Sequence, residues 1–310
     1  MGVVMRMVAA ALTAYGPPEV LRPTELRVPE PGPGQVRIRI RAAGVQPFDL
    51  GVREGWVAPG AGPGFPVVPG NEFAGVVDRL GADVGDFAPG DEVLGYSLLG
   101  AYAQYTTVPA EQLVHKPTAM PWTVAGGFSG NGQGAHLALS RLRVGPGDTV
   151  LIGAAAGALG TFSVQLARAW GATTVIGTAS DRNHDHLRAL GAIPVTYGEG
   201  LVDRIRAVAP GGVDAALDAA GPEGLRAALA VTKDRDRVVT MVAMEEAARL
   251  GLPDWGGNRS AARLAELTAL YEKGALDVHL RATFPLERAA DAHRLVATGH
   301  GRGKVVLTVG

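Results

Sequence analysis

Hydrophobic and polar residues alternate in short runs along the first 120 residues, which are rich in Pro and Gly. The clearest run is QVRIRIRAAGV, where Val36, Ile38 and Ile40 face one way and the neighbouring arginines face the other. A period of two residues is typical of a strand with one buried face. This part of the chain is therefore predicted to be mostly β-structure.

The pattern changes after Pro121, where apolar runs alternate with stretches of helical periodicity. In chain order the successive pairs are TVLIGA with a helix reaching Trp170, TTVIGTA with RNHDHLRALGA, IPVTYG with LVDRIRAVA, and VDAALDAAG with EGLRAALA, followed by RVVTMVA. This βαβ rhythm predicts a doubly wound parallel sheet. A further helix, LAELTALYEKG, and a last strand, GKVVLTV, close the chain.

Composition narrows the range of partners. The 310 residues are 47% hydrophobic, carry a net charge of −1 and include no cysteine. A balanced charge leaves no electrostatic footprint for nucleic acid or an anionic membrane, and no apolar run is long enough to span a bilayer. The absence of cysteine excludes disulfides, thiolate metal sites and cysteine nucleophiles. We therefore expect a cytoplasmic protein with a small-molecule partner, and we interpret the N-terminal segment, interrupted by Arg6, as a first strand rather than an export signal.

The stretch VLIGAAAGALGTFSVQLARAWGA carries the strongest chemical signal. Ala155, Gly157 and Gly160 occupy the three positions of G-x-G-x-x-G, and Ala158 and Leu159 begin the helix that follows. Such a turn brings the backbone close to a pyrophosphate, while the free N–H groups of the helix supply donors. The alternative is a small-residue turn that only packs a helix tightly on a sheet.

The end of the next strand bears on cofactor choice. Where an NAD site carries an acidic residue, this strand ends uncharged and continues into Ser180 and Arg182, which suit the extra charge of a 2′-phosphate. We interpret Asp181 as the N-cap of the following helix, with a ribose contact to NAD as the alternative. His184 and His186 are two positions apart and so are not predicted to form a metal-binding pair.

Several motifs together carry a resemblance that spans nearly the whole chain. They are AYGPPEVL, PGPGQVRIRIRAAGV, DLGVREG, VPGNEFAGVV, GDEV, GAYAQY, the small-residue turn, TASDRN, PLERAADAHR and GKVVL. In this order they resemble the zinc-free quinone oxidoreductase branch of the medium-chain dehydrogenase/reductase superfamily. The resemblance implies an α/β fold in which a GroES-like β-rich catalytic domain, formed by residues 1–120, accompanies a Rossmann NADPH-binding domain, residues 121–258. Residues 259–310 are then expected to return to the catalytic domain.

The resemblance also assigns site residues. Zinc-dependent relatives place a cysteine and a histidine where this chain has Gln46 and Asn71, so no metal is expected. It places Tyr197, Ala220 and Val242 along the cofactor, with Tyr197 in the 2′-phosphate pocket.

Three polar residues, Gln46, Tyr96 and His136, are the candidates for donating to a developing enolate oxygen. The amide of Gln46 cannot be the proton source. The structural alternative for Tyr96 is a half-buried tyrosine on a loop, and the alternative for His136 is a histidine packed at a helix start.

The chain departs from the family pattern at three places. Gly51 stands where a tyrosine is usual, and Gly134, Ala135 and His136 replace a Thr-Ala-aromatic triplet. The region between Thr240 and Leu264 is also short, which puts the last sheet strand and the homodimer formed through it in doubt.

Three functions remain open from the sequence. The first is an NADPH-dependent reductase that transfers hydride to a hydrophobic quinone or α,β-unsaturated carbonyl compound. The second is an enoyl or polyketide-tailoring reductase for one bulky substrate, with Gly51 and Gly134 making room for it. The third is a catalytically silent NADPH-binding sensor.

Overall fold

Strand β3 (Gln35–Val45) lies at the centre of the larger sheet, paired with three other strands. The sheet follows the order β13-β14-β3-β4-β5-β7, and β6 also pairs with β3. Its other strands are β4 (Glu72–Leu80), β5 (Glu92–Tyr96), β6 (Tyr105–Pro109), β7 (Leu113–His115), β13 (Leu280–Pro285) and β14 (Lys304–Thr308). Val36, Ile38 and Ile40 are buried, as their alternation predicts. Arg37 is buried too, because its guanidinium bonds Asp78 and Glu30.

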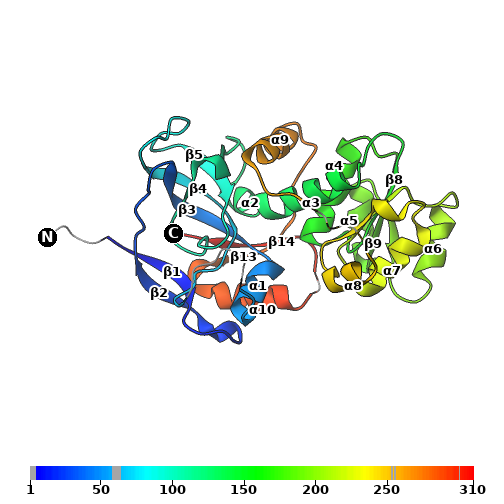
Figure 1. The fold of residues 1–310 in the computed structure, drawn as a ribbon, viewed down its shortest axis with the longest axis horizontal. Helices are drawn as coiled ribbons and strands as arrows, with labels where there is room; N and C mark the ends of the chain where they lie inside the picture. The colour runs from blue at the N-terminus through cyan, green and yellow to red at the C-terminus, as the bar shows by residue number, and fades with distance from the viewer. Residues whose placement is uncertain (1–4, 58–63, 253, 255, 300) are drawn as a thin grey trace. The chain divides into compact units, whose positions relative to one another are not determined.

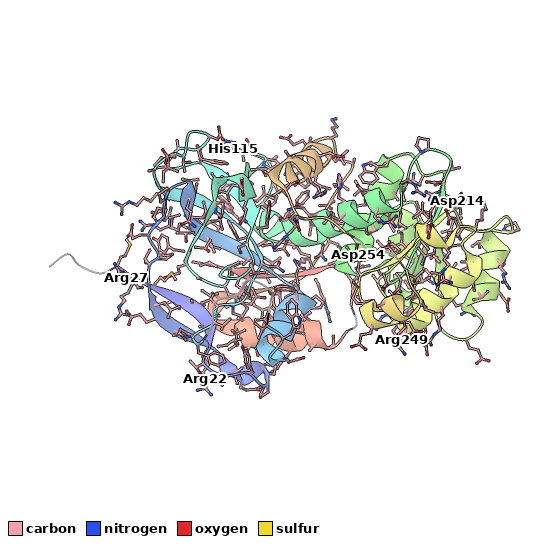
Figure 2. All side chains as sticks on the ribbon, in the orientation of Figure 1. Arg22, Arg27, His115, Asp214, Arg249 and Asp254 are labelled. Atoms are coloured by element: carbon pink, nitrogen blue, oxygen red, sulfur yellow. The ribbon has the colours of Figure 1, made fainter. Side chains whose placement is uncertain are left out.

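A two-stranded sheet contains the first strand expected from the sequence. It pairs β1 (Arg6–Leu12) with β2 (Leu21–Arg27) in antiparallel register. Arg22 and Arg27 lie exposed on β2 (Figure 2). Helices α1 (Pro47–Glu54), α2 (Trp122–Gly126) and α10 (Ala289–Ala297) pack on the larger sheet or on one another, and a separate core fills this part of the chain.

The second sheet is parallel and has the order β10-β9-β8-β11-β12. Its strands are β8 (Thr149–Ile152), β9 (Thr174–Ala179), β10 (Ile193–Thr196), β11 (Ala215–Asp218) and β12 (Val238–Thr240). The strand order reverses at β8, so the carboxyl ends of β8 and β11 flank the switch point at which doubly wound sheets bind ligands. Asp214, just before β11 (Figure 2), joins these strands by accepting a hydrogen bond from the Thr149 amide at 2.8 Å.

Helices connect the parallel strands, as the βαβ pattern predicts (Figure 1). They are α4 (Ala158–Ala169), α5 (His184–Ala189), α6 (Leu201–Val208) and α7 (Pro222–Val231). Helix α3 (Ser129–Arg141) precedes β8 in the chain, and α8 (Met244–Arg249) and α9 (Ala261–Glu272) follow β12. Short 3₁₀ turns cover Pro18–Val20, Ala110–Gln112, Asp181–Asn183, Arg235–Arg237 and Leu286–Arg288. The predicted α/β class, with a parallel Rossmann sheet and a separate β-rich part, is confirmed.

The computed structural model describes residues 5–57, 64–252, 254, 256–299 and 301–310. The chain forms a β-rich unit, Met1–Gly130, Ser260–Thr268 and Leu280–Gly310, and an α/β unit, Asn131–Arg259 and Ala269–His279. This division differs from the expected domains at two places. Residues 121–130 belong to the β-rich unit because α2 packs on β3, so closely that a Cβ on Gly126 would lie 2.5 Å from the Ala42 methyl. Residues 269–279 belong to the α/β unit, where the Asp277 amide donates to Gln165 at 2.9 Å.

The shortened region after Thr240 forms helix α8 instead of a sixth strand. Among the described residues, β12 is therefore the last strand on its side of the parallel sheet. The homodimer expected through this part of the sheet stays a prediction. No helix in the described part of the chain is long and apolar enough to cross a membrane.

Candidate active site

The turn after β8 is shaped by the neighbouring strand β9. Thr178 accepts the Ala154 amide through its hydroxyl at 3.1 Å and the Ala155 amide through its carbonyl at 2.9 Å. These bonds hold Ala154 in the left-handed region, at φ 48°, which a residue with a side chain rarely adopts. Ala155, at the first motif position, is fully buried, and its methyl group lies against Gly177 of β9.

The other two motif positions differ in the space around them. A Cβ on Gly157 would meet only the Ala154 carbonyl, at 3.3 Å. A Cβ on Gly160 would lie 2.4 Å from that carbonyl and 2.5 Å from the Ala155 backbone. Gly160 is thus required for packing of α4 against the turn, whereas a Cβ on Gly157 would press on one carbonyl oxygen only.

Helix α4 begins with its donors uncapped by any side chain. Gly157 is the N-cap, and the amides of Ala158, Leu159 and Gly160 have no acceptor within the helix, as at any helix N-terminus. These amides and the positive end of the helix dipole suit a diphosphate group. The residues at this turn therefore fit the pyrophosphate of a dinucleotide cofactor.

Asp218 joins the ends of β11 and β12 through hydrogen bonds, and the sequence analysis did not predict this role. Its carboxylate accepts the Thr240 hydroxyl at 2.7 Å and the Ala220 amide at 2.9 Å. Burial raises the pKa of Asp218, although these donors oppose the rise. Thr240 in turn accepts the Val242 amide at 3.2 Å. Ala220 and Val242 thus lie at the carboxyl edge of the parallel sheet, and their contact with the cofactor stays a prediction.

The predicted 2′-phosphate residues follow β9 and β10, whose last residues, Ala179 and Thr196, pair in register. The Ser180 hydroxyl accepts the Asn183 side-chain amide at 3.1 Å, and Tyr197 is 53% exposed. Arg182 is exposed and makes no hydrogen bond or ion pair with any described residue. Its guanidinium is therefore available to an anionic ligand.

The interpretation of Asp181 as a helix N-cap is wrong. Ser180 and Asn183 hold the N-cap positions of the 3₁₀ turn and of α5, and neither helix start has a side-chain cap. The Asp181 carboxylate instead accepts the Thr196 hydroxyl and lies 3.6 Å from Nε2 of His184. The bond joins the ends of two parallel strands, which local sequence spacing cannot reveal.

In the β-rich unit, the side chain of Gln46 is held by Glu72, the first residue of β4, and by Asn71, the residue before that strand. Its Nε2 donates to Asn71 Oδ1 at 3.1 Å and to Glu72 Oε1 at 2.8 Å. An amide nitrogen has only two hydrogens, so both are used. The structure does not support Gln46 as a donor to substrate; its Oε1 remains as an acceptor.

Glu72 is the centre of a buried ionic cluster that the sequence reading also missed. Its carboxylate accepts the Gly130 amide at 2.6 Å and pairs with Lys304 Nζ at 2.5 Å. The Glu72 side chain is fully buried and that of Lys304 is 2% exposed. The two positions of the zinc ligands are thus occupied by amides, and an ammonium group lies beside them, which does not suit a second cation.

Asp49 orients the start of α1 next to this cluster. It accepts the Gln46 backbone amide at 2.9 Å, the Gly70 amide at 3.1 Å and the Tyr102 hydroxyl at 3.0 Å. Burial raises the pKa of Asp49 to about 6, with the donors acting in the opposite direction. Through these bonds Asp49 fixes the backbone of Gln46.

Tyr96 and His136 are placed very differently. Tyr96 is 7% exposed, ends β5 and pairs in register with Glu72, so the two side chains lie on the same face of the sheet. Tyr96 and Gln46 therefore both lie beside Glu72. His136 stacks edge-on against Trp170 at 4.9 Å and bonds Ser140 at 3.1 Å.

The position of Trp170 does not support His136 as the acid. Trp170 follows the last turn of α4, about 18 Å along the helix from Ala158 and the turn. The residue of this helix that does lie near the turn is Gly134, whose Cβ would contact Leu159 at 3.5 Å. His136 thus packs against Trp170 from the middle of α3, and not at a helix start as its structural alternative had it.

The parallel sheet, with a turn after β8 that suits a pyrophosphate, is the architecture of a dinucleotide-binding protein. Residues 32–118 match the family model of the alcohol dehydrogenase GroES-like domain, and residues 170–307 match that of a zinc-binding dehydrogenase. The chain belongs to the medium-chain dehydrogenase/reductase superfamily, in its quinone oxidoreductase-like branch.

Individual relatives agree with this assignment. A 2-haloacrylate reductase of a Burkholderia species is 32% identical, with 97% of this chain and 98% of the relative covered. A pikromycin polyketide synthase component of Streptomyces venezuelae is 37% identical over 92% of this chain, which spans only 8% of that protein.

Solved structures also agree with the family assignment. The quinone oxidoreductase of Coxiella burnetii superposes with a TM-score of 0.87 at 30% identity, covering 99% of this chain and 100% of the other. A mycobacterial protein solved in complex with NADPH gives a TM-score of 0.86 at 29% identity, covering 97% and 100%. This chain is therefore an oxidoreductase of the nicotinamide-dependent type.

Proposed function

We propose that this protein is an NADPH-dependent reductase of hydrophobic quinones or α,β-unsaturated carbonyl compounds that works without a metal ion. The observation that carries the proposal is the uncapped start of α4 at the switch point of the parallel sheet, where a Cβ on Gly157 would meet a single atom. NADPH would supply a hydride to an electrophilic carbon of the acceptor. Similarity to a quinone oxidoreductase and to a 2-haloacrylate reductase supports both acceptor classes.

The chain's own residues would bind and orient the reactants. The amides of Ala158, Leu159 and Gly160 bind the pyrophosphate, and Arg182 binds the 2′-phosphate. Tyr96 is the remaining hydroxyl among the three catalytic candidates, and we assign it the role of orienting the acceptor's carbonyl oxygen. Gln46 contributes an acceptor, its Oε1, held in place by Asn71 and Glu72.

An aromatic cluster in the β-rich unit supports a hydrophobic acceptor. Tyr15, Trp56 and Phe65 are three of the four exposed aromatic side chains among the described residues, and they gather around Gly55. Trp56 stacks edge-on against Phe48 at 5.1 Å, and its Cβ lies 3.9 Å from the place of a Cβ on Gly51. Exposed ring faces of this kind suit planar, apolar ligands.

The proposed function can be tested with the purified protein. NADPH binding is followed by nucleotide fluorescence, and NADPH oxidation is followed with a panel of small quinones and enones. We expect binding and turnover with at least one acceptor class. Binding without turnover on any acceptor would instead support the silent sensor, and lack of binding would reject the proposal.

A second candidate, a polyketide-tailoring reductase, has one specific observation in its favour. The chain is 37% identical to a segment of the pikromycin polyketide synthase component. This function predicts turnover with enoyl thioesters in preference to quinones, and the same assay with a thioester in the panel distinguishes the two.

Arg182→Ala is expected to weaken NADPH binding by about 1.5 to 3 kcal/mol, roughly 10- to 150-fold, the range for a charge-assisted contact. NADH has no 2′-phosphate, so its affinity should hardly change. Fluorescence titration of both nucleotides against wild type and variant measures this. Equal losses for the two nucleotides would show that Arg182 does not contact the 2′-phosphate.

Activity is expected to be independent of metal. The amides of Gln46 and Asn71 are poor zinc ligands, and Lys304 already neutralises Glu72. Protein purified without added metal should contain no stoichiometric zinc by elemental analysis, and a chelator should leave NADPH oxidation unchanged. Stoichiometric zinc together with chelator-sensitive turnover would refute the metal-free site.

A further inference from the structure

Asp218, the last residue of β11, buries its carboxylate among the loops at the carboxyl edge of the parallel sheet. The residue is 1% exposed, and its Oδ1 accepts the amides of Ala220 and Gly221 at 2.9 and 3.3 Å. Its Oδ2 accepts the hydroxyl of Thr240, the last residue of β12, at 2.7 Å. These donors are neutral, and burial raises the pKa of Asp218 in spite of them. A buried carboxylate held by neutral donors costs stability, so Asp218 is an unfavourable choice for a purely structural brace.

The hydroxyl of Thr240 uses its whole bonding capacity in this arrangement. Its Oγ1 accepts the Val242 amide at 3.2 Å and the Ala243 amide at 2.9 Å. Because a hydroxyl has two lone pairs and one hydrogen, the hydrogen is left for the Asp218 carboxylate. Only a hydrogen-bond acceptor on the side chain at position 218 permits all three bonds at once. The carboxylate therefore fixes the backbone of residues 241–243 through Thr240.

Two glycines leave the space that the carboxylate occupies. A Cβ on Gly224 of α7 would lie 2.6 Å from Asp218 Oδ1, and a Cβ on Gly153, which follows β8, would lie 3.3 Å from the same oxygen. The backbone carbonyl of Asp218 also accepts the Met241 amide, at 2.9 Å. The carboxylate is therefore confined by α7 and by the turn after β8, and it has little freedom to turn away from Thr240.

The segment fixed by Thr240 lies on the opposite side of β8 from the residues expected to bind adenosine. The sheet order is β10-β9-β8-β11-β12, with Ser180 and Arg182 after β9 and the turn of Gly157 after β8. A dinucleotide crosses such a sheet at its switch point, with one mononucleotide on each side. With the adenosine half beyond β9, the nicotinamide half falls at the ends of β11 and β12, where Val242 is 54% exposed.

We propose that Asp218 is a positioning residue for the dinucleotide: through the Thr240 hydroxyl, its carboxylate sets the backbone of residues 241–243 against the nicotinamide half. The inference rests on the proposed binding of NADPH, and it assigns a task to a side chain that does not itself touch the ligand. Loss of the Thr240 hydroxyl should weaken binding of the nicotinamide half and leave binding of the adenosine half unchanged. A brace that only stabilises the fold would affect both halves alike.

The test compares NADPH with 2′,5′-ADP, which keeps the adenosine half and its 2′-phosphate but lacks the nicotinamide. Calorimetric titrations with both ligands are made on wild type, Thr240→Val and Thr240→Ser. Valine has nearly the shape of threonine without its hydroxyl, so Thr240→Val should weaken NADPH on the order of tenfold, the effect of one lost hydrogen bond. Its affinity for 2′,5′-ADP should not change. Thr240→Ser keeps the hydroxyl and should bind both ligands as wild type does.

Asp218→Asn tests the same link from the other side. With the asparagine oxygen toward the Ala220 amide, its NH₂ group faces the Thr240 hydroxyl, whose lone pairs are already taken. In the flipped orientation the NH₂ group faces the Ala220 amide, which is also a donor. Asp218→Asn should therefore lose NADPH affinity and keep its affinity for 2′,5′-ADP. Thermal transitions establish that each variant is folded.

The ratio of the two affinities decides the outcome. Selective loss of NADPH affinity in Thr240→Val and in Asp218→Asn, with wild-type behaviour of Thr240→Ser, supports the inference. If the two variants keep NADPH affinity, lose both ligands equally or fail to fold, the inference is overturned, while binding to wild type leaves the proposed function intact. If folded wild type binds neither ligand, both the inference and the proposed function are overturned.

Discussion

Gly157→Val is expected to abolish dinucleotide binding in a protein that remains folded, whereas Gly160→Val unfolds the α/β unit. A Cβ on Gly157 would meet a single atom, at 3.3 Å, so its valine branches project into the space assigned to the pyrophosphate. The stability cost should be about 1 kcal/mol, because an apolar residue is a poor N-cap. At Gly160 the Cβ itself would lie 2.4 Å from the Ala154 carbonyl, and a cost of about 3 kcal/mol or more follows.

The two variants form a matched pair, since they make the same change three positions apart. Thermal unfolding and NADPH fluorescence are measured on both. Ala155→Gly is the control for the first motif position: the Ala155 methyl group is buried against Gly177, away from the ligand, so binding should stay comparable to wild type. If Gly157→Val binds NADPH normally, or unfolds as Gly160→Val does, the turn is only a packing device.

Lys304→Met is expected to lower the free energy of unfolding by about 3 to 5 kcal/mol, because it leaves the Glu72 carboxylate buried without its counter-ion. The double variant Glu72→Gln with Lys304→Met removes both charges and should recover part of this loss. The Gly130 amide and Gln46 Nε2 bond different oxygens of Glu72, and the single carbonyl oxygen of a glutamine can keep only one of these two bonds. Denaturant unfolding of the two variants and wild type gives the free energies.

The comparison between the single and the double variant separates the effect of the lost charge from that of the lost packing. If Lys304→Met costs less than about 1 kcal/mol, the ion pair does not hold this part of the β-rich unit. If the double variant is as unstable as the single one, the loss comes from packing of the lysine stem and not from the charge.

The sequence predicts features that depend on residues close together in the chain. The alternation in QVRIRIRAAGV, the βαβ order after Pro121 and the turn around Gly157 are local patterns, and the structure confirms the strands and helices they predict. The short region after Thr240 likewise put the last sheet strand in doubt, and the described sheet ends at β12.

The features that escaped prediction depend on contacts between distant positions. Lys304 meets Glu72 only because β14 and β4 both pair with β3. Asp181 meets Thr196, and Asp218 meets Thr240, because neighbouring parallel strands end at the same edge. The role of His136 depended on the rotation of α3, which turns that side chain toward Trp170. None of these follows from spacing in a single sequence.

The most direct test of the account is the fate of the hydride from NADPH. Chelator-treated protein is incubated with NADPH deuterated at nicotinamide C4 and a small enone, and the product is analysed by mass spectrometry and NMR. The account predicts one deuterium on the β-carbon of the saturated ketone, with the α-carbon proton coming from water, for one of the two C4-deuterated forms of NADPH. A saturated product without deuterium from either form, or turnover that appears only after zinc is restored, would contradict it.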